Sequence, residues 1–162
     1  MKTRRWHFLA TILLGAIGAS QTTNLGKAPA VLFVCEHGAA KSIIAAAEFN
    51  KQAEQKGLPH RAISRGTNPD AAFAPAVISG LAKDGFARPS GKPQLISAAD
   101  VGNAERVVTL GCKLPERLNA KAKPVDWADI SSPSQNYDGA RKDIARHVKE
   151  LVDSLARERS GK

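Results

Sequence analysis

A continuous apolar run gives the first predicted element of the chain. Residues 31–34 are Val-Leu-Phe-Val, without the polar alternation of a half-exposed strand. Such a run is typical of a strand buried on both faces of a parallel sheet, so we expect a central strand here. The run stops at Cys35. Apolar positions then recur at helical spacing from Lys41 to Gln55, and Lys56-Gly57 ends the helix.

Strand and helix patterns continue to alternate along the rest of the chain. The last helix is the clearest, because its apolar residues recur every three or four positions. Alternation of this kind predicts right-handed crossovers and an α/β fold with a parallel sheet between helices. The predicted elements are a strand at 61–65, a helix at 75–84, a short helix capped by Ser97, strands at 106–110 and 124–127, and a helix at 136–157.

The N-terminal segment has the pattern of an export signal. Lys2, Arg4 and Arg5 precede the apolar residues 8–19, and Gly18-Ala19-Ser20 supplies small residues for cleavage. The apolar stretch is shorter than the ~20 residues that span a bilayer, which favours a cleaved signal over an uncleaved anchor. Either the general secretory route or the twin-arginine route would fit these residues.

The domain organisation follows from this segment and from the length of 162 residues, which suits one domain. We expect a signal peptide at 1–20, a linker at 21–28 and the folded domain at 29–158. The mature protein would then be periplasmic or secreted, with no stable membrane insertion after processing. The formal net charge of +9 favours anionic ligands. Lys and Arg are scattered and aromatic residues are few, so no nucleic-acid partner is expected.

The loop from Cys35 to Ser42 carries the clearest chemical signal. Open α/β sheets bind ligands where a loop leaves the carboxyl end of a central strand, and a helix N-terminus there favours phosphate-like oxyanions. A thiol in this place has its pKa lowered from about 8.5, so Cys35 is a candidate nucleophile. The alternative is a small buried hydrophobic residue at a strand end. A nucleoside triphosphate loop is excluded, because Cys35 and Ala40 occupy its glycine positions.

These residues resemble a known family. Val-Leu-Phe-Val-Cys35, followed by five residues and Lys41-Ser42, resembles the phosphate-binding loop of the low-molecular-weight protein tyrosine phosphatases and of the arsenate reductases built on the same fold. The resemblance implies a four-stranded parallel sheet flanked by helices. Residues 64–69, 107–112 and 127–151 also resemble segments of the family. In arsenate reductases the segment similar to 107–112 carries a second redox cysteine.

The resemblance also implies roles for individual residues. Cys35 would be the nucleophile, Ser42 would stabilise its thiolate, and Lys41 would stand where the family has an arginine. The substrate would be a small oxyanion or a phosphorylated molecule, and no cofactor is implied. The four histidines have no spacing typical of a metal site. The oxyanion-binding loop would consist of Glu36, His37, Gly38, Ala39 and Ala40.

The sequence departs from the family pattern within this loop. Lys41 offers a point charge where the family arginine can grip two oxygens at once. Gly38 stands where the family usually has asparagine. Glu36 adds a negative charge that opposes anion binding and raises the pKa of the neighbouring thiol, whereas a protonated His37 would offset that charge.

A further departure concerns the general acid. Family members commonly have Asp-Pro where this chain has Ser132-Pro133. Asp129 is our candidate for the acid and Asp126 is an alternative, although aspartates that flank a tryptophan are often simply solvated surface residues.

Cys112 bears on the choice between the two chemistries of the family. Arsenate reduction would use a second thiol, or an external thiol reductant, to release arsenite from Cys35. A phosphatase needs no second thiol, and Cys112 would then be a buried strand-end residue or a disulfide partner. The third cysteine of the reductase relay is absent. The expected enzyme is therefore phosphatase-like or arsenate reductase-like, with a catalytically impaired oxyanion-binding protein or a Cys35–Cys112 thiol-redox protein as alternatives.

Overall fold

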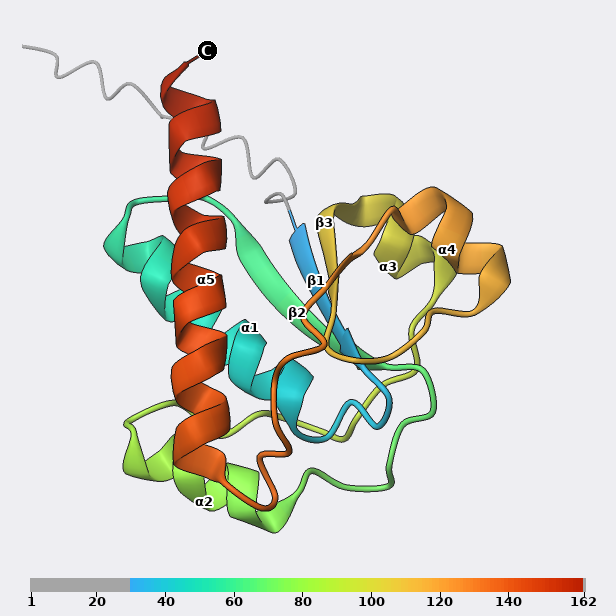
Figure 1. Ribbon diagram of the computed structural model, residues 1–162, viewed down its shortest axis with the longest axis vertical. Helices are drawn as coiled ribbons and strands as arrows, with labels where there is room; N and C mark the ends of the chain where they lie inside the picture. Colours follow the sequence, from blue (N-terminus) through green and yellow to red (C-terminus); the bar gives the residue numbers. More distant parts are fainter. Residues whose placement is uncertain (1–29, 162) are drawn as a thin grey trace, which may run out of the picture.

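The computed structural model describes residues 30–161, which form a sheet with helices on both faces (Figure 1). The predicted signal peptide and linker lie outside the described residues. Within the described part, no helix combines the length and the apolar character that membrane crossing requires. The elements are β1 (Ala30–Cys35), α1 (Lys41–Gln55), β2 (Arg61–Gly66), α2 (Pro75–Lys83), α3 (Ala98–Asn103), β3 (Ala104–Thr109), α4 (Glu116–Ala122), β4 (Val125–Asp126) and α5 (Tyr137–Ser160).

The sheet has four parallel strands in the order β2-β1-β3-β4. The prediction of an α/β fold with a four-stranded parallel sheet is therefore confirmed, and β1 is a central strand as its apolar run predicts. Cys35 at the end of β1 is in register with Gly66 at the end of β2. Because parallel strands end at the same edge, the loop after β1 lies beside the turn after β2, near α2 in Figure 1.

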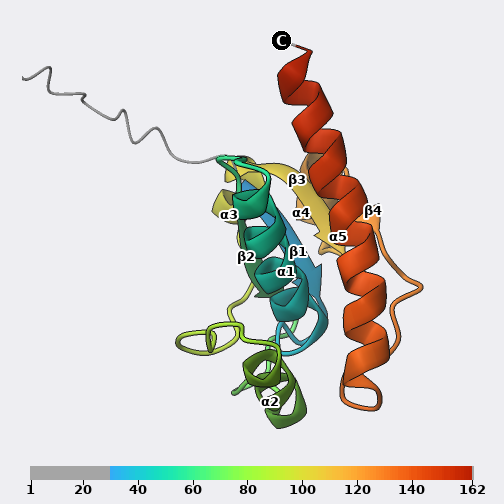
Figure 2. The ribbon, with the colours of Figure 1, turned by 90° about the vertical axis from the view of Figure 1, so that its left-hand side faces the viewer.

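Side chains of β1 alternate between two hydrophobic clusters. Val31, Phe33 and Cys35 belong to the larger cluster, which α1 and α5 cover. Leu32 and Val34 belong to the smaller cluster, which is packed against α3 and α4. Figures 1 and 2 show α1 and α5 on one face of the sheet, with α3 and α4 on the other. Burial on both faces explains why β1 has no polar position.

The short helix α4 is absent from the sequence-based predictions, and the edge strand β4 is shorter than predicted. α4 spans seven residues after Pro115, with Leu118 as its buried residue, so it offers too few turns for a periodic pattern. It ends at Lys123, which adopts a left-handed conformation with φ of 41°. The capping box at the start of α3 agrees with the predicted Ser97 cap.

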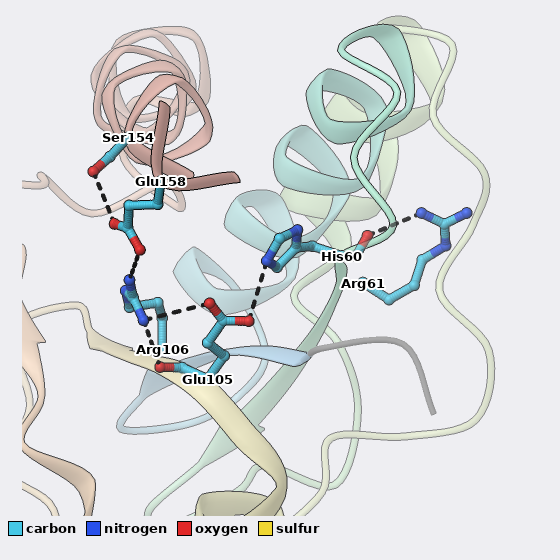
Figure 3. A network of polar contacts seen from close by, with 6 residues as sticks. All are labelled: His60, Arg61, Glu105, Arg106, Ser154 and Glu158. Atoms are coloured by element: carbon cyan, nitrogen blue, oxygen red, sulfur yellow. Dashed lines mark hydrogen bonds and ion pairs between the residues drawn. The ribbon is translucent and has the colours of Figure 1, made fainter. Parts of the chain in front are cut away.

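A chain of polar contacts joins the amino-terminal edge of the sheet to the end of α5 (Figure 3). His60 Nε2 lies 3.2 Å from Glu105 Oε2, and the Arg106 guanidinium donates a hydrogen bond of 2.6 Å to Glu158. Ser154 contacts the same Glu158 carboxylate. These residues lie at the opposite edge of the sheet from the Cys35 loop, so we assign them a role in holding α5 against the sheet.

The contact between α2 and α5 gives a first testable prediction. A Cβ atom at Gly80 would lie 2.4–2.5 Å from three ring atoms of Tyr137, whose hydroxyl donates a hydrogen bond to Asp84. Overpacking costs about 1–3 kcal/mol and the helix propensity of alanine returns at most ~1 kcal/mol, so Gly80→Ala should lower the free energy of unfolding. Urea denaturation measures this. Gly102→Ala in α3 is the matched control, since nothing lies within 4 Å of its Cβ position, and equal stability of both variants would contradict the prediction.

Candidate active site

A pocket of about 220 Å³ lies at the carboxyl end of β1. Four segments converge on it: the loop after β1, the segment between β2 and α2, the turn after β3, and the segment before α5. A larger groove of about 770 Å³ lies beside α1 and β2, but neither cysteine lines it. The smaller pocket is lined by Cys35, Glu36, His37, Ala39, Ala40, Lys41, Asp70, Ala74, Leu110, Gly111, Ser132, Pro133 and Ser134.

The thiol of Cys35 lies next to a buried hydroxyl. Its Sγ atom is 3.2 Å from Ser42 Oγ, and the two residues are 6% and 0% exposed. Ser42 is the second residue of α1, so the sulfur lies close to the N-terminal end of that helix. When the thiol ionises, the hydroxyl can donate its hydrogen bond to the sulfur, and the helix dipole favours the negative charge. The structure therefore brings together the two residues predicted as nucleophile and thiolate partner.

The carbonyl groups of the loop are held by the neighbouring segment 67–74. In a trans peptide the carbonyl and the following N–H point in opposite directions. Because these carbonyls are anchored, the N–H groups of residues 36–38 and 40 point away from that segment. N–H groups with this orientation can donate hydrogen bonds to a bound oxyanion. The anchoring hydrogen bonds run from Thr67 N–H to Cys35 (3.2 Å), Asn68 N–H to Glu36 (2.8 Å), Asp70 N–H to His37 (3.1 Å) and Ala74 N–H to Ala39 (3.1 Å).

Two glycines allow this close packing of backbones. Gly38 has a φ of +61°, which side-chain-bearing residues rarely adopt. A Cβ at Gly66 would lie 2.8 Å from the Gly38 nitrogen and 2.9 Å from the His37 carbonyl carbon. Gly66 is not among the predicted site residues, because a glycine at the end of a strand is common in turns. Its contact with the Cys35 loop is visible only in the folded structure.

Lys41 has its ammonium group beside the turn after β3. The Nζ atom lies 3.7 Å from the position that a Cβ on Gly111 would occupy. Gly111 itself is fixed by a hydrogen bond of 2.9 Å from its N–H to the Asp126 carboxylate, which also accepts one from the Thr109 hydroxyl. Asp126 is thereby engaged in holding this turn. Lys41 and Gly111 both line the pocket, so the lysine can supply positive charge to a bound anion.

The rim of the pocket carries an imidazole between two carboxylates. His37 Nδ1 lies 3.2 Å from Asp70 Oδ1, and His37 Nε2 lies 3.9 Å from Glu36 Oε2. All three residues line the pocket, and their side chains are between half and two thirds exposed. Asp70 has no local sequence signal of its own, because its place beside His37 depends on the pairing of β1 with β2.

Asp129, the predicted general acid, lies elsewhere. His147 on α5 lies 2.9 Å from its carboxylate and Arg146 lies 3.5 Å from it. The hydrogen bond with His147 lowers the pKa of Asp129, and the imidazole stacks on Trp127 with ring centroids 4.9 Å apart. Asp129 is absent from the residues that line the Cys35 pocket, whereas Ser132 and Pro133 line it. The structure thus does not bring Asp129 together with Cys35.

Cys112 lies close to the end of β1 but on the other face of the sheet. Its Sγ is 3.5 Å from the carbonyl oxygen of Val34, and it packs with Leu32 in the smaller cluster, whereas Cys35 belongs to the larger one. Both cysteines are free. Burial, followed by the charge of Cys35, raises the pKa of the Cys112 thiol to about 11. At neutral pH Cys112 is therefore a protonated thiol and a poor nucleophile.

A cysteine with a hydroxyl partner, in a loop whose carbonyls are anchored beside a helix N-terminus, has the arrangement of a phosphate-binding loop. The family model for the low molecular weight phosphotyrosine protein phosphatases matches residues 30–160. The chain belongs to this family. Within residues 30–161, no group of three or more His, Cys, Asp or Glu side chains could hold a metal ion.

Solved structures of several family branches share the fold. A YwlE mutant from Bacillus subtilis superposes with a TM-score of 0.69 at 17% identity, covering 78% of this chain and 98% of the other. A low molecular weight protein tyrosine phosphatase from T. tengcongensis gives 0.65 at 18% identity, covering 78% and 99%. The thioredoxin-dependent arsenate reductase Cg_ArsC1' of Corynebacterium glutamicum gives 0.63 at 25% identity, covering 78% of this chain and 61% of that one. A direct comparison with curated protein sequences finds no match.

Proposed function

We propose that this chain is a cysteine-dependent phosphatase that hydrolyses phosphomonoesters in the pocket above Cys35. The observation that carries the proposal is the contact of 3.2 Å between Cys35 Sγ and Ser42 Oγ at the base of a loop with anchored carbonyls. The hydroxyl and the helix N-terminus stabilise the thiolate, and the loop N–H groups stabilise the charge that develops on the phosphoryl oxygens.

The reaction would proceed in two displacements. The Cys35 thiolate attacks phosphorus, the bond to the leaving oxygen breaks, and a cysteinyl phosphate forms. Water then attacks the same phosphorus, the sulfur–phosphorus bond breaks, and inorganic phosphate leaves with the thiolate restored. Lys41 would contribute charge to the phosphoryl group in both steps, without the two-pronged grip of an arginine.

Arsenate reduction is a second candidate. It is supported by the 25% identity to the Corynebacterium glutamicum enzyme, although this chain spans 61% of the length of that protein. In this reaction Cys35 would displace water from arsenate, and a thiol would attack the sulfur of the adduct to release arsenite. Cys112 is poorly suited to be that thiol, because its pKa is raised to about 11 and it packs on the opposite face of the sheet. The reductant would therefore be an external thiol.

The test compares two reactions of the mature protein. Phosphate release from p-nitrophenyl phosphate and arsenite release from arsenate with added thiol are measured for the parent and for Cys35→Ser. We expect Cys35-dependent phosphate release. Arsenite release without phosphatase activity would favour the second candidate. Phosphate binding without turnover in either assay would instead indicate a catalytically impaired oxyanion-binding protein.

Replacement of Cys112 separates hydrolysis from an internal thiol relay. We expect Cys112→Ser to retain phosphatase activity close to that of the parent, because the residue lies outside the pocket and the exchange of sulfur for oxygen changes the side-chain volume little. Steady-state kinetics under reducing conditions check this. Loss of turnover together with a reversible Cys35–Cys112 disulfide in the parent would contradict it and support a thiol-redox protein.

We also propose export of the mature domain to the periplasm or the medium, which rests on the pattern of residues 1–20 alone. N-terminal sequencing of protein recovered from the periplasmic fraction would show cleavage near Ser20. Full-length protein confined to the cytoplasm would contradict export.

A further inference from the structure

The pocket lacks an acid at the place where the family has one. Protonation of the leaving oxygen requires a proton donor that reaches the pocket. Ser132 occupies the expected place, and Asp129 is paired with His147 away from the pocket. The wall formed by Leu110, Gly111 and residues 132–134 has no ionisable side chain.

The opposite rim supplies the remaining ionisable groups. Besides Cys35 and the cation of Lys41, the ionisable residues that line the pocket are Glu36, His37 and Asp70. Among these, imidazole is the group that general acid–base catalysis uses most often, so it is suited to hold a proton before the first displacement and to give it up during that step.

Asp70 holds His37 through two contacts. Asp70 contacts His37 through its carboxylate, 3.2 Å from Nδ1, and through its backbone N–H, which donates to the His37 carbonyl at 3.1 Å. Nε2 lies 3.9 Å from Glu36, beyond hydrogen-bonding distance. Asp70 thus holds Nδ1, Nε2 makes no hydrogen bond to Glu36, and the residue lines the pocket, which is the arrangement of an oriented acid–base imidazole.

We propose that His37 is the general acid of this enzyme and that Asp70 is its positioning residue, an inference that rests on the proposed phosphatase activity. As the Cys35 thiolate attacks, the leaving oxygen takes the Nε2 proton of the imidazolium and departs as an alcohol. The neutral imidazole then accepts a proton from the water that attacks the cysteinyl phosphate. Hydroxide bonds to phosphorus, the sulfur–phosphorus bond breaks, and the imidazolium and the thiolate are both restored.

The test uses the dependence of the rate on the leaving group. p-Nitrophenolate leaves readily without a proton, whereas the more basic phenolate of phenyl phosphate needs one. His37→Gln should lower kcat/KM, which reports the first displacement, by about a hundredfold for phenyl phosphate, the usual scale of general acid catalysis, and by much less for p-nitrophenyl phosphate. Glu150→Gln on the exposed surface of α5 is the control variant. Thermal melting and phosphate binding show that each variant keeps its fold and its pocket.

The pH profile provides a readout that a structural role would not change. The alkaline limb of kcat/KM, where the acid loses its proton, should be absent in His37→Gln. Asp70→Asn should lower kcat/KM for phenyl phosphate more than for p-nitrophenyl phosphate, because the carboxylate that contacts Nδ1 is lost. Equal losses of kcat/KM on both substrates in His37→Gln, or a leaving-group effect on kcat/KM in Asp129→Asn instead, would overturn the role of His37 as the acid. No turnover by the parent on either substrate would overturn the phosphatase proposal itself.

Discussion

Gly66→Ala is expected to lower the phosphatase activity by about a hundredfold, although residue 66 has no side chain in the pocket. The added Cβ would lie 2.8 Å from the Gly38 nitrogen and 2.9 Å from the His37 carbonyl carbon, so the loop backbone must move. Misplacement of a reacting group by about 1 Å can lower a rate about a hundredfold. Steady-state kinetics with p-nitrophenyl phosphate measure the loss.

The control for this variant separates loop geometry from folding. Overpacking at Gly66 is expected to lower the free energy of unfolding by about 1–3 kcal/mol, which a stable domain tolerates. Gly102→Ala, at an open position, should leave both activity and stability near the parent values. A folded Gly66→Ala protein with parental kcat would show that the packing of Gly66 against the backbone of His37 and Gly38 does not determine the geometry of the oxyanion-binding loop.

The second large effect is expected at Lys41. Removal of one preorganised group that stabilises developing charge typically lowers kcat by about a hundredfold or more, so Lys41→Met should have that effect. Lys41→Arg restores the family residue and can contact two oxygens at once, so we expect its kcat/KM to equal or exceed that of the parent. Parental activity in Lys41→Met would show that the ammonium group does not stabilise the charge that develops during the reaction.

The central part of the fold follows from the sequence for physical reasons. The run Val31–Val34 has no polar position because β1 is covered on both faces, and this pattern gave the central strand directly. The periodic face of α5 likewise predicted a long packed helix. α4 has only seven residues and β4 only two, so neither contains enough turns or alternations to leave a pattern in the sequence.

Some residues of the candidate site could likewise be predicted from the sequence, whereas others could not. Cys35 and Ser42 are close in sequence and are joined by a single loop, so their proximity of 3.2 Å could be anticipated. Asp70 and Gly66 reach the loop only through the pairing of β1 with β2, which local patterns do not specify. Asp129 is a candidate because it lies close in sequence to Ser132, which stands where the family has its acid. Its partner His147 comes from α5, a contact that only the packing of this helix reveals.

The central claim is that Cys35 carries the phosphoryl group during turnover. The most direct measurement is a rapid acid quench of the parent during turnover of p-nitrophenyl phosphate, followed by mass spectrometry of the peptide that contains Cys35. We predict one phosphoryl group on Cys35, absent in Cys35→Ser, which should also lose turnover. Turnover that persists in Cys35→Ser, or a phosphoryl group on another residue, would contradict the account.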